Sequence, residues 1–144
     1  MEDVSVIPAE ILVVEDNPSD VRLFLNEFKK INFLTNVNVV TNDVDALKYL
    51  NQDEEYNDFP RPDLLVLDLY MPNKNGIEVL SEMSKYKHLR DILVVIFSAS
   101  EPTNILINYQ NDVQHIFITK PNNLEEYKTI IKIVENFWLK LKKK

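Results

Sequence analysis

Acidic side chains stand at the ends of two apolar runs in this chain of 144 residues. Asp68 follows the run at residues 64–67, and the pair Glu15-Asp16 follows the run at residues 11–14. Carboxylates that are brought together repel one another unless a cation neutralises them. Mg²⁺ is the natural cation, because it takes hard oxygen ligands, keeps several waters and often bridges carboxylates and phosphate. These three residues therefore predict a magnesium site.

Two further apolar runs end in groups that suit a phosphoryl group. Residues 93–97 lead to Ser98, and residues 116–119 lead to Lys120. Aspartate is a competent nucleophile toward phosphorus, and phosphoryl transfer mainly requires positioning and charge neutralisation. Each residue alone is more often a turn, cap or surface residue. Their joint placement at four strand ends favours a phosphoryl-transfer site on Asp68, with the lysine neutralising charge and the hydroxyl donating a hydrogen bond.

Apolar runs alternate with helical patterns along the whole chain, which is typical of βα units and a mostly parallel sheet. We expect an α/β fold of the flavodoxin-like (βα)5 type, a doubly wound parallel five-stranded sheet of order 2-1-3-4-5. This order makes the first and third strands neighbours, so Glu15, Asp16 and Asp68 would share one crevice at the carboxyl edge. Strands are expected at 10–15, 36–40, 64–68, 93–98 and 115–119, and helices at 18–31, 43–51, 75–86, 102–110 and 123–141.

Local signals support two of the expected helices. Asn17 is a good N-cap and Pro18 a good first residue for the first helix. In the second helix, Val44, Leu47 and Leu50 are expected to share the face that meets the core. The polar segment 51–63 is expected to be a long loop.

Length and composition predict one domain over residues 1–144, with a core at about 9–140, a short acidic N-terminus and a lysine-rich C-terminal tail. The chain has no cysteine and no signal peptide pattern, which favours the cytoplasm. No apolar run is long enough to span a membrane. The net charge is −7, and the acidic body argues against nucleic-acid binding. The two isolated histidines make zinc a poor choice of metal.

With these motifs in this order, the chain resembles the receiver domain of a two-component response regulator over about residues 9–140. The resemblance rests on Glu15-Asp16, the segment 67–72 around Asp68 with Gly76 eight residues later, Ser98-Ala99 and Lys120-Pro121. It implies the flavodoxin-like fold and a phosphorelay function. The implied partner is a sensor histidine kinase that supplies the phosphoryl group.

The resemblance also assigns roles at the metal site. Asp68 would be the phosphoacceptor, and Asp16 and Asp68 would bind Mg²⁺. Glu15 would bind the ion through water, and the backbone carbonyl of Tyr70 would be a further ligand. The protein would be no enzyme toward other substrates, since it would catalyse only its own phosphorylation and dephosphorylation.

Further roles concern the switch that follows phosphorylation. The resemblance implies that Ser98 is the switch residue that carries a hydroxyl group and that Phe117 is the aromatic switch residue. Lys120 occupies the position of the lysine that is invariant in the family. It also implies a cis peptide bond between Lys120 and Pro121, and proline is the residue for which a cis bond is least costly.

More narrowly, the chain resembles stand-alone receivers that work with phytochrome-type histidine kinases. The features are Arg61-Pro62-Asp63 before the third strand and residues 136–139 near the end. In the last helix, Ile133 and Phe137 widen the apolar stripe beyond an ordinary core face. They are candidates for a homodimer or kinase interface on the face formed by segments 102–110, 115–119 and 123–141.

Three alternatives use the same fold or chemistry. Phosphatases of the haloacid dehalogenase type usually have an acid two residues after the nucleophile, where this chain has Tyr70. A flavin-binding module needs a phosphate-cradling first loop, and residues 15–18 would repel an anion. A receiver-like scaffold that works without phosphorylation remains the open alternative.

Overall fold

The computed structural model describes residues 9–30, 35–68, 76–98 and 115–119, together with the helical residues 125, 128, 131, 132, 135 and 136. Several predictions fall outside these residues and stay predictions. They concern the side chains of Ser98 and Phe117, the Tyr70 carbonyl, Lys120 and its cis bond to Pro121, the helix at 102–110, and the interface candidates Ile133 and Phe137.

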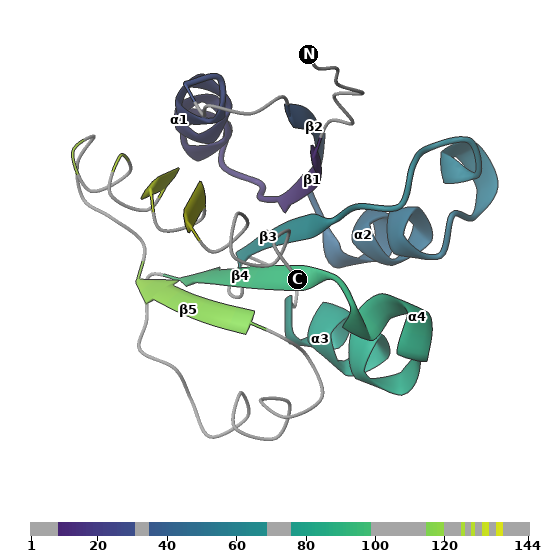
Figure 1. Ribbon diagram of the computed structural model, residues 1–144. Helices are drawn as coiled ribbons and strands as arrows, with labels where there is room; N and C mark the ends of the chain where they lie inside the picture. The colour runs from purple at the N-terminus through teal and green to yellow at the C-terminus, as the bar shows by residue number, and fades with distance from the viewer. Residues whose placement is uncertain are drawn as a thin grey trace, which may run out of the picture.

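Five parallel strands form one sheet in the order β2-β1-β3-β4-β5, as the sequence predicts (Figure 1). Each strand begins and ends within one residue of its expected position. The prediction succeeds because long apolar runs with little polar alternation are typical of strands that are buried on both faces. The strands are β1 (Ala9–Val14), β2 (Thr35–Val40), β3 (Leu64–Asp68), β4 (Leu93–Ser98) and β5 (His115–Thr119).

The described helices connect these strands as crossovers. Asn17 is the N-cap of α1, because its side-chain oxygen accepts hydrogen bonds from the backbone N–H groups of Ser19 and Asp20 at 2.9 and 3.2 Å. The segment expected to be a long loop contains one short 3-10 helix, η1. A second short helix, α4, lies between α3 and β4, where the sequence predicted no helix. None of the helices in the described ranges could cross a membrane. The elements are α1 (Pro18–Phe28), α2 (Asp43–Leu50), η1 (Glu54–Tyr56), α3 (Gly76–Lys85) and α4 (Lys87–Arg90).

The sheet has a separate hydrophobic core on each face. Alternate residues of a strand point to opposite faces, so Leu12 and Val14 pack with the side chains of α2 and α3. Ile11 and Val13 pack on the other side, with α1 and with Ile131 of the last helix. Figure 1 shows the same arrangement, with α1 on one side of the sheet and α2, α3 and α4 on the other.

The expected core face of α2 is wrong at one position. Val44 is 57% exposed, whereas Ala46, Tyr49 and Leu50 are buried. At about 100° per residue, Val44 lies on the side of the helix opposite these three residues. The helix therefore turns a different stripe toward the sheet, and it places the ring of Tyr49 in the core.

Candidate functional site

The register of the sheet brings the acidic strand ends to one level. Val14 of β1 is paired with Leu67 of β3, so the residues that follow, Glu15 and Asp68, are neighbours at the carboxyl edge. Asp68 itself is the last residue of β3 and pairs with Phe97 of β4. This edge is where ligands bind in open parallel sheets.

The same register continues to the other predicted residues. Ser98, the residue after Phe97, ends β4 one step beyond the level of Asp68. It pairs with Thr119, the last residue of β5, and Lys120 follows directly in the chain. The backbone therefore brings all four strand ends to the same edge of the sheet, although the side chains of Ser98 and Lys120 lie outside the described part.

Three carboxylates form a compact cluster at this edge. One ligand oxygen from each of Glu15, Asp16 and Asp68 lies within 4.8 Å of the other two. Glu15 is 1% exposed and Asp68 is 4% exposed, while Asp16 is partly exposed. Burying charged groups together costs free energy unless they are compensated. This cluster therefore has the charge and the spacing of a cation site.

The cluster fits a small hard cation. Mg²⁺ binds oxygen at about 2.1 Å, so two ligands on opposite sides of the ion are about 4.2 Å apart. The spacing of the three carboxylates allows two of them to bind directly and the third through a water molecule. An all-oxygen set of this size is what Mg²⁺ or Mn²⁺ prefers.

The loop between β1 and α1 holds Glu15 in place from two directions. The backbone N–H of Glu15 donates a hydrogen bond to the carbonyl oxygen of Val40 at 3.1 Å, which ties the loop to the end of β2. The backbone N–H of Asn17 donates to Oε2 of Glu15 at 3.1 Å. Asn17 thus both starts α1 and positions a carboxylate. Sequence reasoning finds only the first role, because a backbone donor has no residue-type signature.

The segment Arg61-Pro62-Asp63 lies away from this site, next to the amino ends of the strands. Nε of Arg61 donates to the carbonyl oxygen of His88 in α4 at 3.1 Å. The carboxylate of Asp63 accepts from the backbone N–H of Glu10 at 2.9 Å. These contacts tie the segment before β3 to β1 and α4, which gives Arg61 and Asp63 a structural role in the described protein.

Comparison with known proteins agrees with this geometry. The family model of the response regulator receiver domain matches residues 11–132. The response regulator Rcp1 of Synechocystis sp. is 34% identical over 140 residues, which are 96% of this chain and 95% of that protein.

Solved structures show the same similarity. The phosphorylated cyanobacterial phytochrome response regulator RcpA superposes with a TM-score of 0.83 at 36% identity, covering 92% of this chain and 95% of the other. The Mn²⁺-bound form of Rcp1 gives a TM-score of 0.81 at 34% identity, with the same coverage. Both similarities extend over nearly the whole of this chain, and the residues matched by the family model include the acidic cluster.

Proposed function

This chain belongs to the response regulator receiver domain family, and we propose that it accepts a phosphoryl group from a sensor histidine kinase onto Asp68 in the presence of Mg²⁺. One observation carries the proposal. Asp68 ends β3 in a buried position, and its carboxylate lies within 4.8 Å of those of Glu15 and Asp16. A nucleophilic carboxylate beside a cation site is what phosphoryl transfer to aspartate requires.

The residues that would hold Mg²⁺ are Asp16 and Asp68 directly, Glu15 through water, and the backbone carbonyl of Tyr70. The compact carboxylate cluster supports the first three, and the Mn²⁺-bound form of the similar protein Rcp1 supports a divalent ion. When bound, the ion would neutralise negative charge on the carboxylates and on the incoming phosphoryl group. Asn17 and Val40 would keep Glu15 oriented toward it.

In the proposed reaction a carboxylate oxygen of Asp68 attacks the phosphorus of a phosphohistidine. The new O–P bond forms as the N–P bond breaks, and the electron pair returns to the imidazole nitrogen of the kinase. Lys120 would balance charge on the phosphoryl oxygens, and Ser98 would hydrogen-bond one of them. The protein would catalyse only this transfer and the later hydrolysis of its own acyl phosphate.

The signal would leave through a change at Ser98 and Phe117. A phosphoryl group adds about −1.5 to −2 charges at neutral pH, which would draw the hydroxyl of Ser98 toward it. Phe117 would then turn into the space that Ser98 leaves. The affected surface would be the face of segment 102–110, β5 and segment 123–141, where Ile133 and Phe137 would support a homodimer. A cis Lys120-Pro121 bond would place Lys120 beside Asp68.

The proposed kinase partner is a cytoplasmic sensor, and a phytochrome-like kinase is the first candidate. The support is the similarity to RcpA, whose structure is described as that of a cyanobacterial phytochrome response regulator, over 92% of this chain. We propose no contact with nucleic acid or with a membrane, because the net charge is −7 and both of these surfaces favour basic proteins.

The decisive experiment measures the intact mass of the protein after incubation with Mg²⁺ and phosphoramidate. We expect a gain of one phosphoryl group that requires Mg²⁺ and is lost in Asp68→Asn. Glu78→Gln, which changes an exposed carboxylate on α3, serves as the control and should gain the group normally.

A different result would favour the scaffold that works without phosphorylation. If the wild-type protein binds Mg²⁺ but gains no phosphoryl group from phosphoramidate or from a histidine kinase, the proposal is wrong. A mass gain that persists in Asp68→Asn would place the acceptor on another residue and would also contradict it.

A further inference from the structure

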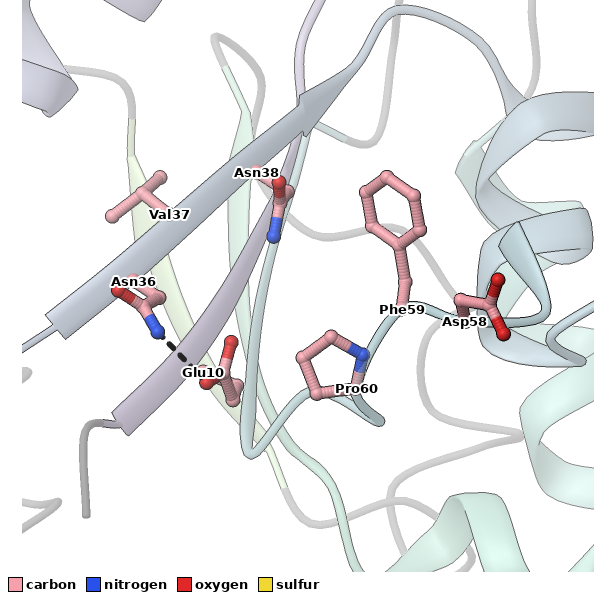
Figure 2. Close-up of a pocket in the computed structure, with 7 residues that line it drawn as sticks. All are labelled: Glu10, Asn36, Val37, Asn38, Asp58, Phe59 and Pro60. Carbon is pink, nitrogen blue, oxygen red and sulfur yellow. Dashed lines mark hydrogen bonds between the residues drawn. The ribbon is translucent and has the colours of Figure 1, made fainter. Parts of the chain in front are cut away.

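A pocket lies at the end of the sheet opposite the acidic cluster. It has a volume of about 400 Å³. One side is formed by the beginnings of β1 and β2, and the facing side by the loop before β3 (Figure 2). The lining residues are Glu10, Asn36, Val37, Asn38, Asp58, Phe59 and Pro60.

This pocket is distinct from the proposed phosphorylation site. Glu10 is the second residue of β1, whereas Glu15 directly follows its end. Five residues of extended strand span about 17 Å at roughly 3.3 Å per residue. No residue of the acidic cluster lines the pocket, and so one ligand cannot occupy both sites.

The pocket is negatively charged. Glu10 contributes its carboxylate, Asp58 is a second acidic lining residue, and the lining contains no lysine or arginine. Oε2 of Glu10 accepts a hydrogen bond from Nδ2 of Asn36 at 3.0 Å, as Figure 2 shows. Oε1 of Glu10 is buried and accepts no hydrogen bond within the described part of the chain. A buried acceptor without a donor costs roughly 1–3 kcal/mol, so a donor supplied by a ligand would be favoured here.

The walls of the pocket are already ordered. Nδ2 of Asn38 donates to the hydroxyl oxygen of Tyr49 at 3.0 Å. The ring of Phe59 meets those of Tyr49 and Tyr56 edge-on, with ring centres 5.4 and 5.5 Å away. Gln52 anchors the backbone of this loop, since its Nε2 donates to the carbonyl oxygen of Phe59 at 2.7 Å. Phe59 is nevertheless 36% exposed, which leaves part of an aromatic ring available to a ligand.

The position of β2 favours an extended peptide as the occupant. β2 is the outermost strand of the sheet, and within the described residues it pairs only with β1. The free edge of such a strand can pair with a peptide strand. Every second side chain of that peptide would point to the face on which Asn36 and Asn38 lie, because side chains alternate along a strand.

We propose that this pocket binds the guanidinium group of an arginine side chain in an extended segment of a partner protein. A guanidinium is planar, carries five N–H donors and packs well on aromatic rings. It would donate to Glu10, with a small outward movement of the side chains that cover Oε1, and would lie against Phe59. Asp58, whose carboxylate points away from Glu10 in Figure 2, would add only to the overall negative charge around the pocket. The proposal does not depend on phosphorylation of Asp68.

The test is an NMR titration of the ¹⁵N-labelled full chain with the blocked tripeptide acetyl-Ala-Arg-Ala-amide. The side-chain amide signals of Asn36 and Asn38 report directly on the pocket. We expect them to shift in a saturable way. The citrulline analogue has the same shape without the charge. We expect the citrulline peptide and the lysine peptide each to bind at least about tenfold more weakly than the arginine peptide.

Three variants make the test specific. Glu10→Gln keeps the shape of the side chain and should weaken binding about tenfold or more. Phe59→Leu, in the exposed loop, should weaken it about threefold. Glu55→Gln removes an exposed charge from η1 outside the pocket and should leave the affinity within about twofold. A cooperative unfolding transition well above the temperature of the titration shows that each variant is folded.

Several results would overturn the proposal. The first is equal binding of the arginine and citrulline peptides, and the second is equal binding of the arginine and lysine peptides. A third is equal weakening by Glu10→Gln and Glu55→Gln, which would indicate general attraction to an acidic protein. The absence of any shift at Asn36 and Asn38 would overturn it as well. Normal phosphorylation in all variants would show that Asp68 is unaffected.

Discussion

Glu10 and Glu15 lie at the two ends of the same strand, and their surroundings give the two carboxylates different chemistry. Glu15 belongs to a cluster with two other carboxylates, which suits a dication. The carboxylate of Glu10 lines a pocket with aromatic and amide side chains, in which Asp58 is the other acidic residue, and this lining suits a flat organic cation. At the scale of the residue, the two glutamates are therefore suited to different ligands because different side chains surround them.

The acidic cluster predicts that Mg²⁺ stabilises the protein. An ion that binds only the folded state adds about 1.4 kcal/mol to the free energy of unfolding at a concentration ten times its Kd. Asp68→Asn removes one of the three charges and should reduce this gain to less than half. The measurement is the thermal unfolding midpoint with and without Mg²⁺. Glu78→Gln should behave as the wild type, and an equal gain in Asp68→Asn would contradict the assigned site.

Tyr49 predicts a specific loss of stability at high pH. Burial raises the pKa of its phenol above the usual value, and the carboxylate of Glu10 raises this pKa further. The unfolded chain therefore loses the phenol proton first, near pH 10. The stabilising contribution is complete below that pH and is lost as the pH rises toward the higher pKa of the folded state.

Tyr49→Phe tests this contribution by urea unfolding between pH 8 and 11. At pH 8 the variant should be about 1 kcal/mol less stable, because Asn38 loses its hydrogen-bond acceptor. The difference from the wild type should shrink above pH 10. Tyr86→Phe, at an exposed tyrosine, should show no such convergence, and a constant difference for Tyr49→Phe would contradict the prediction.

At the scale of the element, α2 shows how a short helix is oriented by its surroundings. Its N-cap is Asn42, whose Oδ1 accepts from the backbone N–H of Asp45 at 2.7 Å. The helix begins where the sequence predicts, but its core stripe contains Ala46, Tyr49 and Leu50 instead of Val44. The hydroxyl of Tyr49 accepts a hydrogen bond from Asn38 on β2, which links that side of the helix to the sheet.

Alanine substitutions should separate the two sides of α2. Leu50 is 2% exposed in the core, so Leu50→Ala should lower the free energy of unfolding by about 2–4 kcal/mol. Val44→Ala should change it by no more than about 0.5 kcal/mol, since the side chain is exposed and alanine favours helix. Urea unfolding of both variants measures the difference. Comparable losses in the two variants would show that Val44 is packed.

At the scale of the whole molecule, the sheet separates two proposed sites. The acidic cluster lies at the carboxyl edge, and the pocket of Glu10 and Phe59 lies at the amino end beside β2. β5, the described part of the proposed dimer face, is at the opposite edge of the described sheet from β2. A kinase, a second copy and a peptide could therefore use separate surfaces.

The dimer proposal predicts that phosphorylation changes the mass of the particle in solution. We expect the wild-type protein to sediment as a dimer after treatment with Mg²⁺ and phosphoramidate. Phe137→Ser should gain the phosphoryl group but remain monomeric, because it removes apolar area from the proposed interface. Asn136→Ser is the matched control. Dimerisation of Phe137→Ser as in the wild type would contradict this role for Phe137.

The sequence by itself determined the strands, their order and the acidic residues of the candidate site. The strands are readable because a parallel sheet that is covered on both faces needs uninterrupted apolar runs. Asp68 and Glu15 are readable because a polar residue that ends such a run lies at the edge of the sheet. Because right-handed crossovers allow few strand orders, the sequence also predicts that these two carboxylates are neighbours.

Only the tertiary structure decided the contacts between distant segments. Glu10 meets Asn36 and Asp63, which lie 26 and 53 positions away in the chain, and its position in the sequence gives no sign of either. The same holds for the stripe that α2 turns to the core and for the backbone N–H of Asn17 beside Glu15. Such contacts depend on packing between elements and on backbone groups common to all residues, so no local pattern of side chains can encode them.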